Sequence, residues 1–377
     1  MAFSGSICRI GKLSSMVEKT TAVELRTSPH IRSAPSVDQI MRNVIYALLP
    51  VCAFAVYQFG ISVLALILVT TLACVLTEHM FCWFSRIPTT IGDNSAAVTG
   101  VLLGLTLPPG FPLWMAIVAG FIGIALAKVM FGGIGFNVFN PALVGRAFVQ
   151  AAFPVAITTW TPAFAPGRFT EFIPSTWTIP FAAPVSVTEW VEGISFSTQG
   201  TLGIDGFTGA TPLALQKFQQ ITTDVGSMFL GISAGSAGET SALLIFLCGM
   251  YLVFRKMMDW RIPVAVLLGA FVTAGVFFLS DGEHYPDPFF VLFSGGLMLG
   301  AVFMATDMVA SPVTPWGVWS YGILIGFVTV IIRLFGGLSE GVMYAILLGN
   351  AASPLIEAVT QPRVYGTGRE QQKKAEL

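Results

Sequence analysis

Two stretches far apart in the chain read almost alike, and their likeness decides which fold to expect. Residues 120–133 read GFIGIALAKVMFGG, and residues 326–337 read GFVTVIIRLFGG. Further on, FNPALVG (139–145) parallels GNAASPLIE (349–357) in its order of Asn, Pro and Leu. The sequence therefore predicts an internal repeat, with one copy in each half of the chain.

The composition predicts that both copies lie in a membrane. Of the 377 residues, 54% are hydrophobic and only 10% are charged, and the mean hydropathy is +0.78. Soluble domains carry about 25% charged residues, because water is the solvent of their surface. The net charge of −1 comes without any basic stripe, which argues against nucleic acid as a partner. The chain is expected to be a polytopic membrane protein.

Apolar runs predict an all-α fold with about ten transmembrane helices, five in each repeat. An odd number of helices places the second copy upside down, and such inverted repeats are typical of transporters. Two runs look broken, because one ends in LTLPPGFP and the other runs through GGLMLGAVFMATD. The expected spans are 43–59, 61–82, 95–107, 112–130, 138–155, 239–254, 262–279, 288–306, 317–334 and 341–359.

The basic residues set the expected orientation, since Lys and Arg concentrate on the cytoplasmic side of membrane proteins. Both termini are then cytoplasmic, and no secretory signal is expected at the start of the chain. The domain organisation follows from this. We expect a cytoplasmic arm (1–42), a first transmembrane repeat (43–155), an extracytoplasmic loop (156–238), a second repeat (239–359) and a cytoplasmic tail (360–377).

No motif for bond-making chemistry is visible in the chain. It has no nucleophile elbow, no Walker loop and no dinucleotide fingerprint. The 5 Cys lack C-x-x-C spacing and the 3 His are dispersed, so neither a metal site nor a catalytic residue is expected. A redox carrier or an ion pathway needs no such motif, because a cofactor supplies the reactivity.

The loop 205–214, DGFTGATPLA, holds a small polar cluster with two interpretations. In the first, Thr211 is a helix N-cap and Pro212 occupies the first helical position, where its missing N–H costs nothing. That interpretation predicts a helix over 212–220. It leaves the residues before Thr211 unexplained.

In the second interpretation the same loop is a flavin attachment site. Asp205, Thr208, Gly209, Ala210 and Thr211 fit the pattern D-x-x-[ST]-G-A-[ST], which resembles the acceptor motif of flavin transferases. The resemblance implies a phosphoester between FMN and the Thr211 hydroxyl, which is then a phosphoryl threonine. We expect this hydroxyl to be accessible on the outer face of the membrane. A phosphate there would lie at the positive end of the following helix.

Charged residues at membrane depth are candidates for an ion pathway, because burying a charge in lipid is costly. Arg146 falls within the expected fifth span and would need a carboxylate, a carbonyl cluster or an anionic ligand. Asp93 and Asp307 lie at span ends, where a helix cap or a turn explains them equally well. Lys128 and Arg333 occupy corresponding places in the two repeats, and snorkelling to the interface is the favoured explanation for both. Glu78 and Glu357 lie near span ends and carry little information.

The chain as a whole resembles the NqrB/RnfD family of membrane flavoprotein subunits. The short arm resembles the RnfD branch, whose complexes transfer electrons between ferredoxin and NAD, more than the NqrB branch. The resemblance rests on SPHIRS (28–33), DNSAAVTG (93–100), FGGIGFNVFNPALVGRAF (131–148), DGFTGATPL (205–213), ATDMVASP (305–312) and PRVYG (362–366).

This resemblance implies a subunit of an ion-translocating oxidoreductase, a translocase of the inner (cytoplasmic) membrane that moves sodium or protons. It implies covalent FMN at Thr211, a further riboflavin, and the partner subunits RnfG, RnfA and RnfE. Two alternatives stay open. The chain could serve a sodium-pumping NADH:quinone oxidoreductase in the manner of NqrB, or the repeat could belong to a cofactor-free channel or carrier.

Overall fold

The computed structural model divides the chain into two units, Met1–Ser36 and Val37–Leu377, and the fold below is that of the second unit. Most of the expected arm and tail lies outside the described residues, as do Asp205, Thr208, Gly209 and Ala210 of the loop motif. The structure describes residues 36–86, 89–180, 211–220, 222–231, 235–239, 241–282, 284–337 and 339–362.

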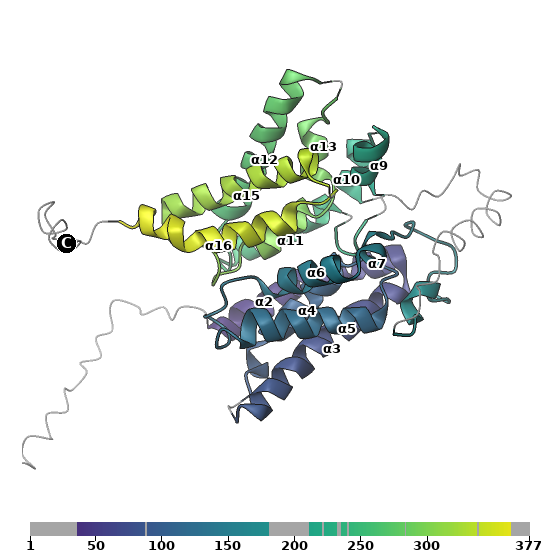
Figure 1. The fold of residues 1–377 in the computed structure, drawn as a ribbon, viewed down its shortest axis with the longest axis vertical. Helices are drawn as coiled ribbons and strands as arrows, with labels where there is room; N and C mark the ends of the chain where they lie inside the picture. Colours follow the sequence, from purple (N-terminus) through teal and green to yellow (C-terminus); the bar gives the residue numbers. More distant parts are fainter. Residues whose placement is uncertain are drawn as a thin grey trace, which may run out of the picture. The chain divides into compact units, whose positions relative to one another are not determined.

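Throughout the described ranges the regular structure is helical, as the apolar runs predict, and the helices form an earlier and a later group (Figure 1). The earlier group contains α2 (Val37–Phe59), α3 (Ile61–Phe84), η1 (Ile91–Asp93), α4 (Ser95–Thr106), α5 (Leu113–Ile124), η2 (Ala125–Val129), α6 (Pro141–Ala152), α7 (Pro154–Thr158) and η3 (Pro174–Trp177). The later group contains α9 (Pro212–Gln219), α10 (Val225–Leu230), α11 (Ala242–Phe254), α12 (Arg261–Ser280), α13 (Pro288–Phe293), α14 (Leu297–Leu299), η4 (Gly300–Met304), α15 (Pro315–Phe335) and α16 (Val342–Thr360).

Among the described residues, 5 helices are long and apolar enough to cross a membrane. They have 19 to 24 residues, close to the length of about 20 that a bilayer requires. The membrane character predicted from composition is therefore supported by helix length. The five are α2, α3, α12, α15 and α16.

The two runs expected to be broken are broken. Helix α4 ends after 12 residues, where Leu107 turns to extended backbone before two prolines. In the second run α13 ends at Phe293, and Gly295 has φ +59°, a conformation that glycine adopts without a Cβ clash. The chain then resumes as α14 and η4.

Two π-helical turns lie in these groups, one in each. Met130 donates its N–H to the Ala125 carbonyl (3.0 Å), and Ala305 donates to the Gly300 carbonyl (2.7 Å). Both bonds close a turn one residue wider than that of an α-helix. Turns of this kind are rare and are frequent at functional sites.

Close helix packing depends on glycines within the repeated stretches. A Cβ on Gly123 of α5 would lie 2.6 Å from the Pro141 carbonyl oxygen of α6. On α15, a Cβ on Gly326 would lie 2.5 Å from the Ala270 nitrogen of α12. Small residues at these positions let the helix backbones approach, as is usual inside membranes.

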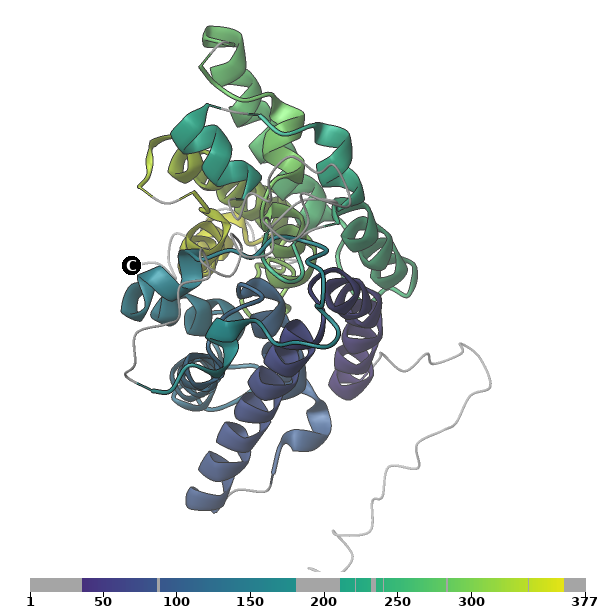
Figure 2. The same cartoon turned by 90° about the vertical axis from the view of Figure 1, so that its right-hand side faces the viewer.

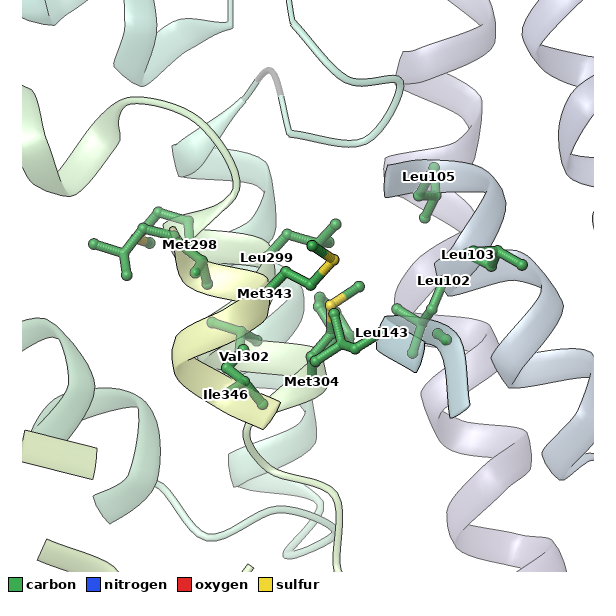
Figure 3. Packing of buried hydrophobic residues seen from close by; sticks show 14 of the residues in the cluster. Leu102, Leu103, Leu105, Leu143, Met298, Leu299, Val302, Met304, Met343 and Ile346 are labelled. Atoms are coloured by element: carbon green, nitrogen blue, oxygen red, sulfur yellow. The ribbon is translucent and has the colours of Figure 1, made fainter. Parts of the chain in front are cut away.

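Side chains of both groups meet in one core. Leu102 and Leu143 of the earlier group lie near Met304 and Met343 of the later group (Figure 3). Helix α2 also packs on α11 (Figure 2). The Tyr251 hydroxyl of α11 donates to Asn43 Oδ1 of α2 at 3.1 Å. The candidate functional residues lie around this junction.

Candidate functional site

Thr211 is the N-cap of α9, as the Thr-Pro pair predicts. Its Oγ1 accepts the N–H of Ala214 at 3.2 Å, and Pro212 follows at the first helical position. The cap satisfies one of the N–H groups that a helix start leaves without a partner. The helix ends at Gln219, one residue before the predicted end.

The expectation that the Thr211 hydroxyl is accessible is wrong for the folded chain. Thr211 exposes only 4% of its surface, and its hydroxyl oxygen is engaged in the cap bond with the Ala214 N–H. Leu213, two residues on, is buried as well. The rest of the expected attachment motif, Asp205 to Ala210, lies outside the described residues.

Helix α9 is fastened to the end of α15. Lys217 Nζ donates to the carbonyl oxygens of Arg333 (2.9 Å) and Gly336 (2.5 Å). A cation is favoured there, because the C-terminus of a helix carries partial negative charge. Partial burial lowers the pKa of Lys217. At the other side of α9, a Cβ on Gly295 would lie 2.5 Å from Leu213 Cδ1.

Arg146 pairs with two carboxylates, one of the kinds of partner that a charge within an apolar run requires. It is 6% exposed, and its Nη1 donates to Glu239 Oε1 at 2.9 Å while its Nη2 pairs with Glu340. The three residues come from α6, from the segment before α11 and from the loop between α15 and α16. We call Arg146, Glu239 and Glu340 the arginine cluster.

Glu239 has a perturbed pKa. Burial and the nearby Glu340 carboxylate together raise its pKa to about 7, although Arg146 opposes the shift. Its Oε2 finds no hydrogen-bond partner among the described residues. A Cβ on Gly296, in the break between α13 and α14, would touch this carboxylate, so the glycine makes room for it.

The snorkelling explanation of Lys128 is wrong, because the residue is 3% exposed. Its Nζ lies 2.6 Å from Glu78 Oε1 of α3 and 2.5 Å from Ser95 Oγ of α4. We call Lys128, Glu78 and Ser95 the lysine cluster. Lys128 turns inward because a carboxylate and a hydroxyl are within its reach there.

The same explanation is wrong for Arg333, which is 5% exposed. Its guanidinium donates to the carbonyl oxygens of Val291 (2.6 Å) and Ser294 (3.0 Å). These carbonyls belong to the end of α13, whose last carbonyl groups have no helical partner. The Arg333 side chain, which belongs to α15, therefore caps the C-terminal end of α13.

Asp93 is the local cap that one of its two interpretations predicts. Its Oδ1 accepts the Ser95 N–H (2.9 Å) and the Ser95 hydroxyl (2.6 Å). Through Ser95 it is one hydrogen bond removed from Lys128. Asp93 therefore lies beside the lysine cluster.

Asp307 is a turn residue that also faces a cavity. Its Oδ1 accepts the Val309 N–H at 3.2 Å. Burial raises its pKa, while hydrogen bonds from Val309 and Asn137 oppose the shift. Asn140, three residues after Asn137, donates to the Met304 carbonyl at 3.2 Å, which ties the 134–141 segment to η4.

The cavity lies between the two groups of helices, and its empty space, open solvent at the mouth included, is about 820 Å³. Most of its wall is apolar, with side chains from α2, α4, the 134–141 segment and the segments that follow α11 and η4. Its polar lining residues include Ser95, Lys128, Asn137, Asn140 and Asp307. The structure thus brings two of the three predicted pathway residues, Asp93 and Asp307, to the surroundings of one cavity.

Arg146 and Thr211 lie outside that cavity. Arg146 lines a smaller hollow of about 270 Å³ with Glu239 and Glu340. Sequence reasoning missed both of these glutamates, and it set Glu78 aside. The signal for Glu78 was present, since an acid and a base in two apolar runs of the same repeat are stable at depth only when they pair.

A family model matches most of the sequence. The NQR2, RnfD, RnfE family matches residues 24–366. The match covers both groups of helices and the segment that carries Thr211.

Individual relatives match over similar lengths, and each is named as the D subunit of an oxidoreductase complex. The relative from Clostridium ljungdahlii, of a proton-translocating ferredoxin:NAD(+) oxidoreductase complex, is 38% identical over 361 residues, 93% of this chain and 98% of the relative. The relative from Acetobacterium woodii, of a Na(+)-translocating ferredoxin:NAD(+) oxidoreductase complex, is 41% identical over 340 residues, 90% of this chain and 94% of the relative. The relative from Actinobacillus succinogenes, of an ion-translocating oxidoreductase complex, is 36% identical over 359 residues, 92% and 98% of the two chains. With nearly its whole length matched, the chain belongs to the NQR2, RnfD, RnfE family.

Proposed function

We propose that the chain is the RnfD subunit of a membrane complex that transfers electrons between ferredoxin and NAD and moves sodium or protons. The observation that carries this proposal is the match to relatives of that kind over 90% or more of the chain. The buried charges at the junction of the helix groups agree with it, because an ion path needs polar groups at membrane depth. The chain acts as an oxidoreductase and translocase only within that complex.

The proposed electron carrier of this subunit is FMN, joined through its phosphate to Thr211. The position fits a phosphoester, because Thr211 Oγ1 lies at the N-terminus of α9 and already faces the Ala214 N–H. Negative charge is favoured at such an end. Since the hydroxyl is buried once α9 is docked, we propose that the flavin is attached before α9 packs on α15. When bound, FMN supplies the redox chemistry, and the chain supplies its position.

In-gel fluorescence of the denatured complex tests the attachment. Wild type should show a flavin band at this subunit, Thr211→Ala should lose it, and Thr211→Ser should keep it. Mass spectrometry of the peptide spanning 203–217 should show one added FMN. Ser241→Ala is a matched control, because Ser241 caps α11 by accepting the Leu244 N–H and lies outside the motif. Unchanged fluorescence in Thr211→Ala would place the flavin elsewhere.

A second, non-covalent flavin is proposed for the cavity beside Asp307. Its wall is mostly apolar, which suits a flat ring, and Asp307 and the hydroxyl groups of Thr99 and Thr306 lie on it with oxygens that can accept hydrogen bonds from a flavin edge. Riboflavin should therefore leave the Thr211→Ala complex on denaturation, and should be recovered from the extract. A denatured Thr211→Ala complex without any flavin would contradict this.

The number, symmetry and orientation of the membrane crossings are part of the same proposal. Ten membrane crossings in two inverted repeats (43–155 and 239–359), joined by an extracytoplasmic loop, would put both termini in the cytoplasm. The packing supports the repeat, since α3 packs on α5 and α5 on α6 as α12 packs on α15 and α15 on α16. Cysteine labelling at Glu171 and Asp259, from opposite sides of the inner membrane, would test the topology.

The proposed partners are RnfG, beside the flavin on the outer side, and the membrane subunits RnfA and RnfE. For the moving ion we propose Asp93, Asp307 and Arg146 as pathway residues. In support, Asp93 and Asp307 lie near one cavity and Arg146 lies in a separate polar cluster. Asp307→Asn should lower ion movement per electron more than it lowers flavin content, measured in sealed vesicles.

A further inference from the structure

The lysine cluster is built from three elements that the fold brings together. Lys128 lies on the π turn η2, Glu78 on α3 and Ser95 on the first turn of α4. The Lys128 and Glu78 side chains are 4% and 2% exposed. The ammonium nitrogen thus has two oxygen neighbours at 2.6 and 2.5 Å, and both charged side chains are almost fully buried.

Stability alone does not account for this arrangement. Taking two charges out of water costs about as much as their attraction returns, and well-packed apolar residues are often the more stable choice. The two oxygens of the Glu78 carboxylate also differ in their hydrogen bonds. Its Oε1 accepts from both Lys128 and Thr90, while its buried Oε2 has no partner among the described residues.

The surroundings supply what a small cation needs. Ser95 and Lys128 form part of the cavity wall, so the cluster has an approach. Asp307 lines the same cavity and provides a second carboxyl group there. Lys128 lies on a π turn, and such turns are frequent at functional sites.

Occupancy of two oxygens limits how the cluster can work. The Lys128 ammonium already lies on Glu78 Oε1 and Ser95 Oγ, so a further cation can bind these atoms only when the ammonium leaves. Among the described residues, the other titratable groups near the cluster include Asp93 before α4, Cys74 on α3 and Asp307 on the cavity wall. None of these three groups is a cation.

We propose that Glu78 and Ser95 form a binding site for one monovalent cation, Na⁺ or a proton, which competes with the Lys128 ammonium for the same oxygens. The ammonium is a built-in occupant, and it withdraws toward Asp307 when the transported cation binds. The proposal rests on the proposed function only in taking this cation to be the one that the complex moves.

The test measures how the coupling cation saturates turnover of the purified complex in liposomes. In Lys128→Met the built-in competitor is gone, so half-saturation should need roughly tenfold less cation, equivalent to about 1.4 kcal/mol. Lys128→Arg keeps a permanent charge on the site and should need more cation than wild type. Glu78→Gln should abolish the dependence. The control Glu171→Gln changes an exposed carboxylate and should behave as wild type.

Two arms distinguish the sources of the cation. If Na⁺ is the ligand, the shift appears when Na⁺ replaces choline at fixed pH. If a proton is the ligand, the shift appears in the pH profile at fixed Na⁺. Variants that lower the maximal rate but leave half-saturation within about twofold of wild type would overturn the proposal, since this is the result of a merely structural ion pair.

A second measurement applies when Lys128→Met fails to assemble or turnover is absent. Carbodiimides react with protonated carboxyl groups, so their labelling of Glu78 in native membranes reports its occupancy by mass spectrometry. Lys128→Arg, which keeps the pair, is expected to be labelled no faster than wild type, and the coupling cation should change labelling of Glu78 but not of Glu171. Labelling of Glu78 that is insensitive to both Na⁺ and pH would overturn the proposal. Loss of covalent flavin in Thr211→Ala is scored separately, so the two proposals can fail independently.

Discussion

Lys128 and Arg333 occupy corresponding places in the repeated stretches, yet the molecule uses them in opposite ways. Both are buried, and both lie beside a helix that stops inside the fold. Lys128 contacts a carboxylate and a hydroxyl at the start of α4, whereas Arg333 contacts two carbonyl groups at the end of α13.

The difference follows from the polarity of the helix that each cation meets. The end of α13 has unpaired carbonyl groups and partial negative charge, so a cation alone completes it. The start of α4 carries partial positive charge, so a cation is stable there only with an anion beside it, and Glu78 supplies that anion. One cation completes a structural cap, while the other belongs to an ion pair that can exchange partners.

The largest expected effect comes from breaking the pair at Lys128. Lys128→Met leaves the Glu78 carboxylate buried without its cation and should cost about 3–5 kcal/mol of stability. The double variant Lys128→Met with Glu78→Gln should recover most of this loss. Thermal unfolding of the purified subunit or complex measures both, and additive losses in the double variant would mean that the two residues act independently.

A smaller loss is expected at the other cation. Arg333→Met removes the guanidinium donors from the carbonyl groups of Val291 and Ser294, which should cost about 1–3 kcal/mol. No carboxylate variant should restore it, because the partners of Arg333 among the described residues are carbonyl groups. Arg333→Lys can satisfy one carbonyl and should lie between the two in the same unfolding measurement. A rescue by Glu239→Gln would show that Arg333 belongs to an ion pair instead of a cap.

The arginine cluster should make stability depend on pH. The pKa of Glu239 rises from 4.5 to about 7 on folding, so between these values the folded protein binds more protons than the unfolded chain. Stability should then fall as the pH rises through this window, by an amount on the order of 1 kcal/mol. Glu239→Gln should flatten the curve of unfolding temperature against pH, and Glu171→Gln should leave it sloped.

The smallest effect is expected at the link between α9 and α15. Lys217→Met removes the bonds to the Arg333 and Gly336 carbonyls and should loosen α9 by about 0.5–1.5 kcal/mol. Limited proteolysis after residue 211 should become faster, while the global unfolding temperature stays nearly constant. Lys217→Arg keeps a donor and should remain protected. Equal cleavage in both variants would mean that other contacts fix α9.

Local features of this fold could be predicted from sequence, because their causes are local. Thr211 and Pro212 specify a cap and the first helical residue by themselves. The two prolines after Leu107 end α4, and the paired glycines at 295–296 end the run through α13. The apolar runs likewise predict membrane helices, since hydropathy acts residue by residue.

The candidate sites could be predicted only in part, because their partners are distant in the chain. Lys128 lies 50 residues from Glu78, and Arg146 lies 93 and 194 residues from its two carboxylates. The spacing of apolar residues does not reveal pairings between residues so far apart in the chain. Snorkelling is therefore the explanation that the sequence favours for Lys128 and Arg333. The accessibility expected of Thr211 failed for a related reason, since the docking of α9 depends on α15.

The last turn of α15 contacts both α9 and the end of α13. Its carbonyl groups bind Lys217 of α9, and its Arg333 side chain binds the end of α13. A displacement of α9 by one ångström must therefore either break these bonds or move α13 together with α9. Helix α9, which begins after Thr211, and the break at Gly295 are therefore mechanically coupled through the last turn of α15.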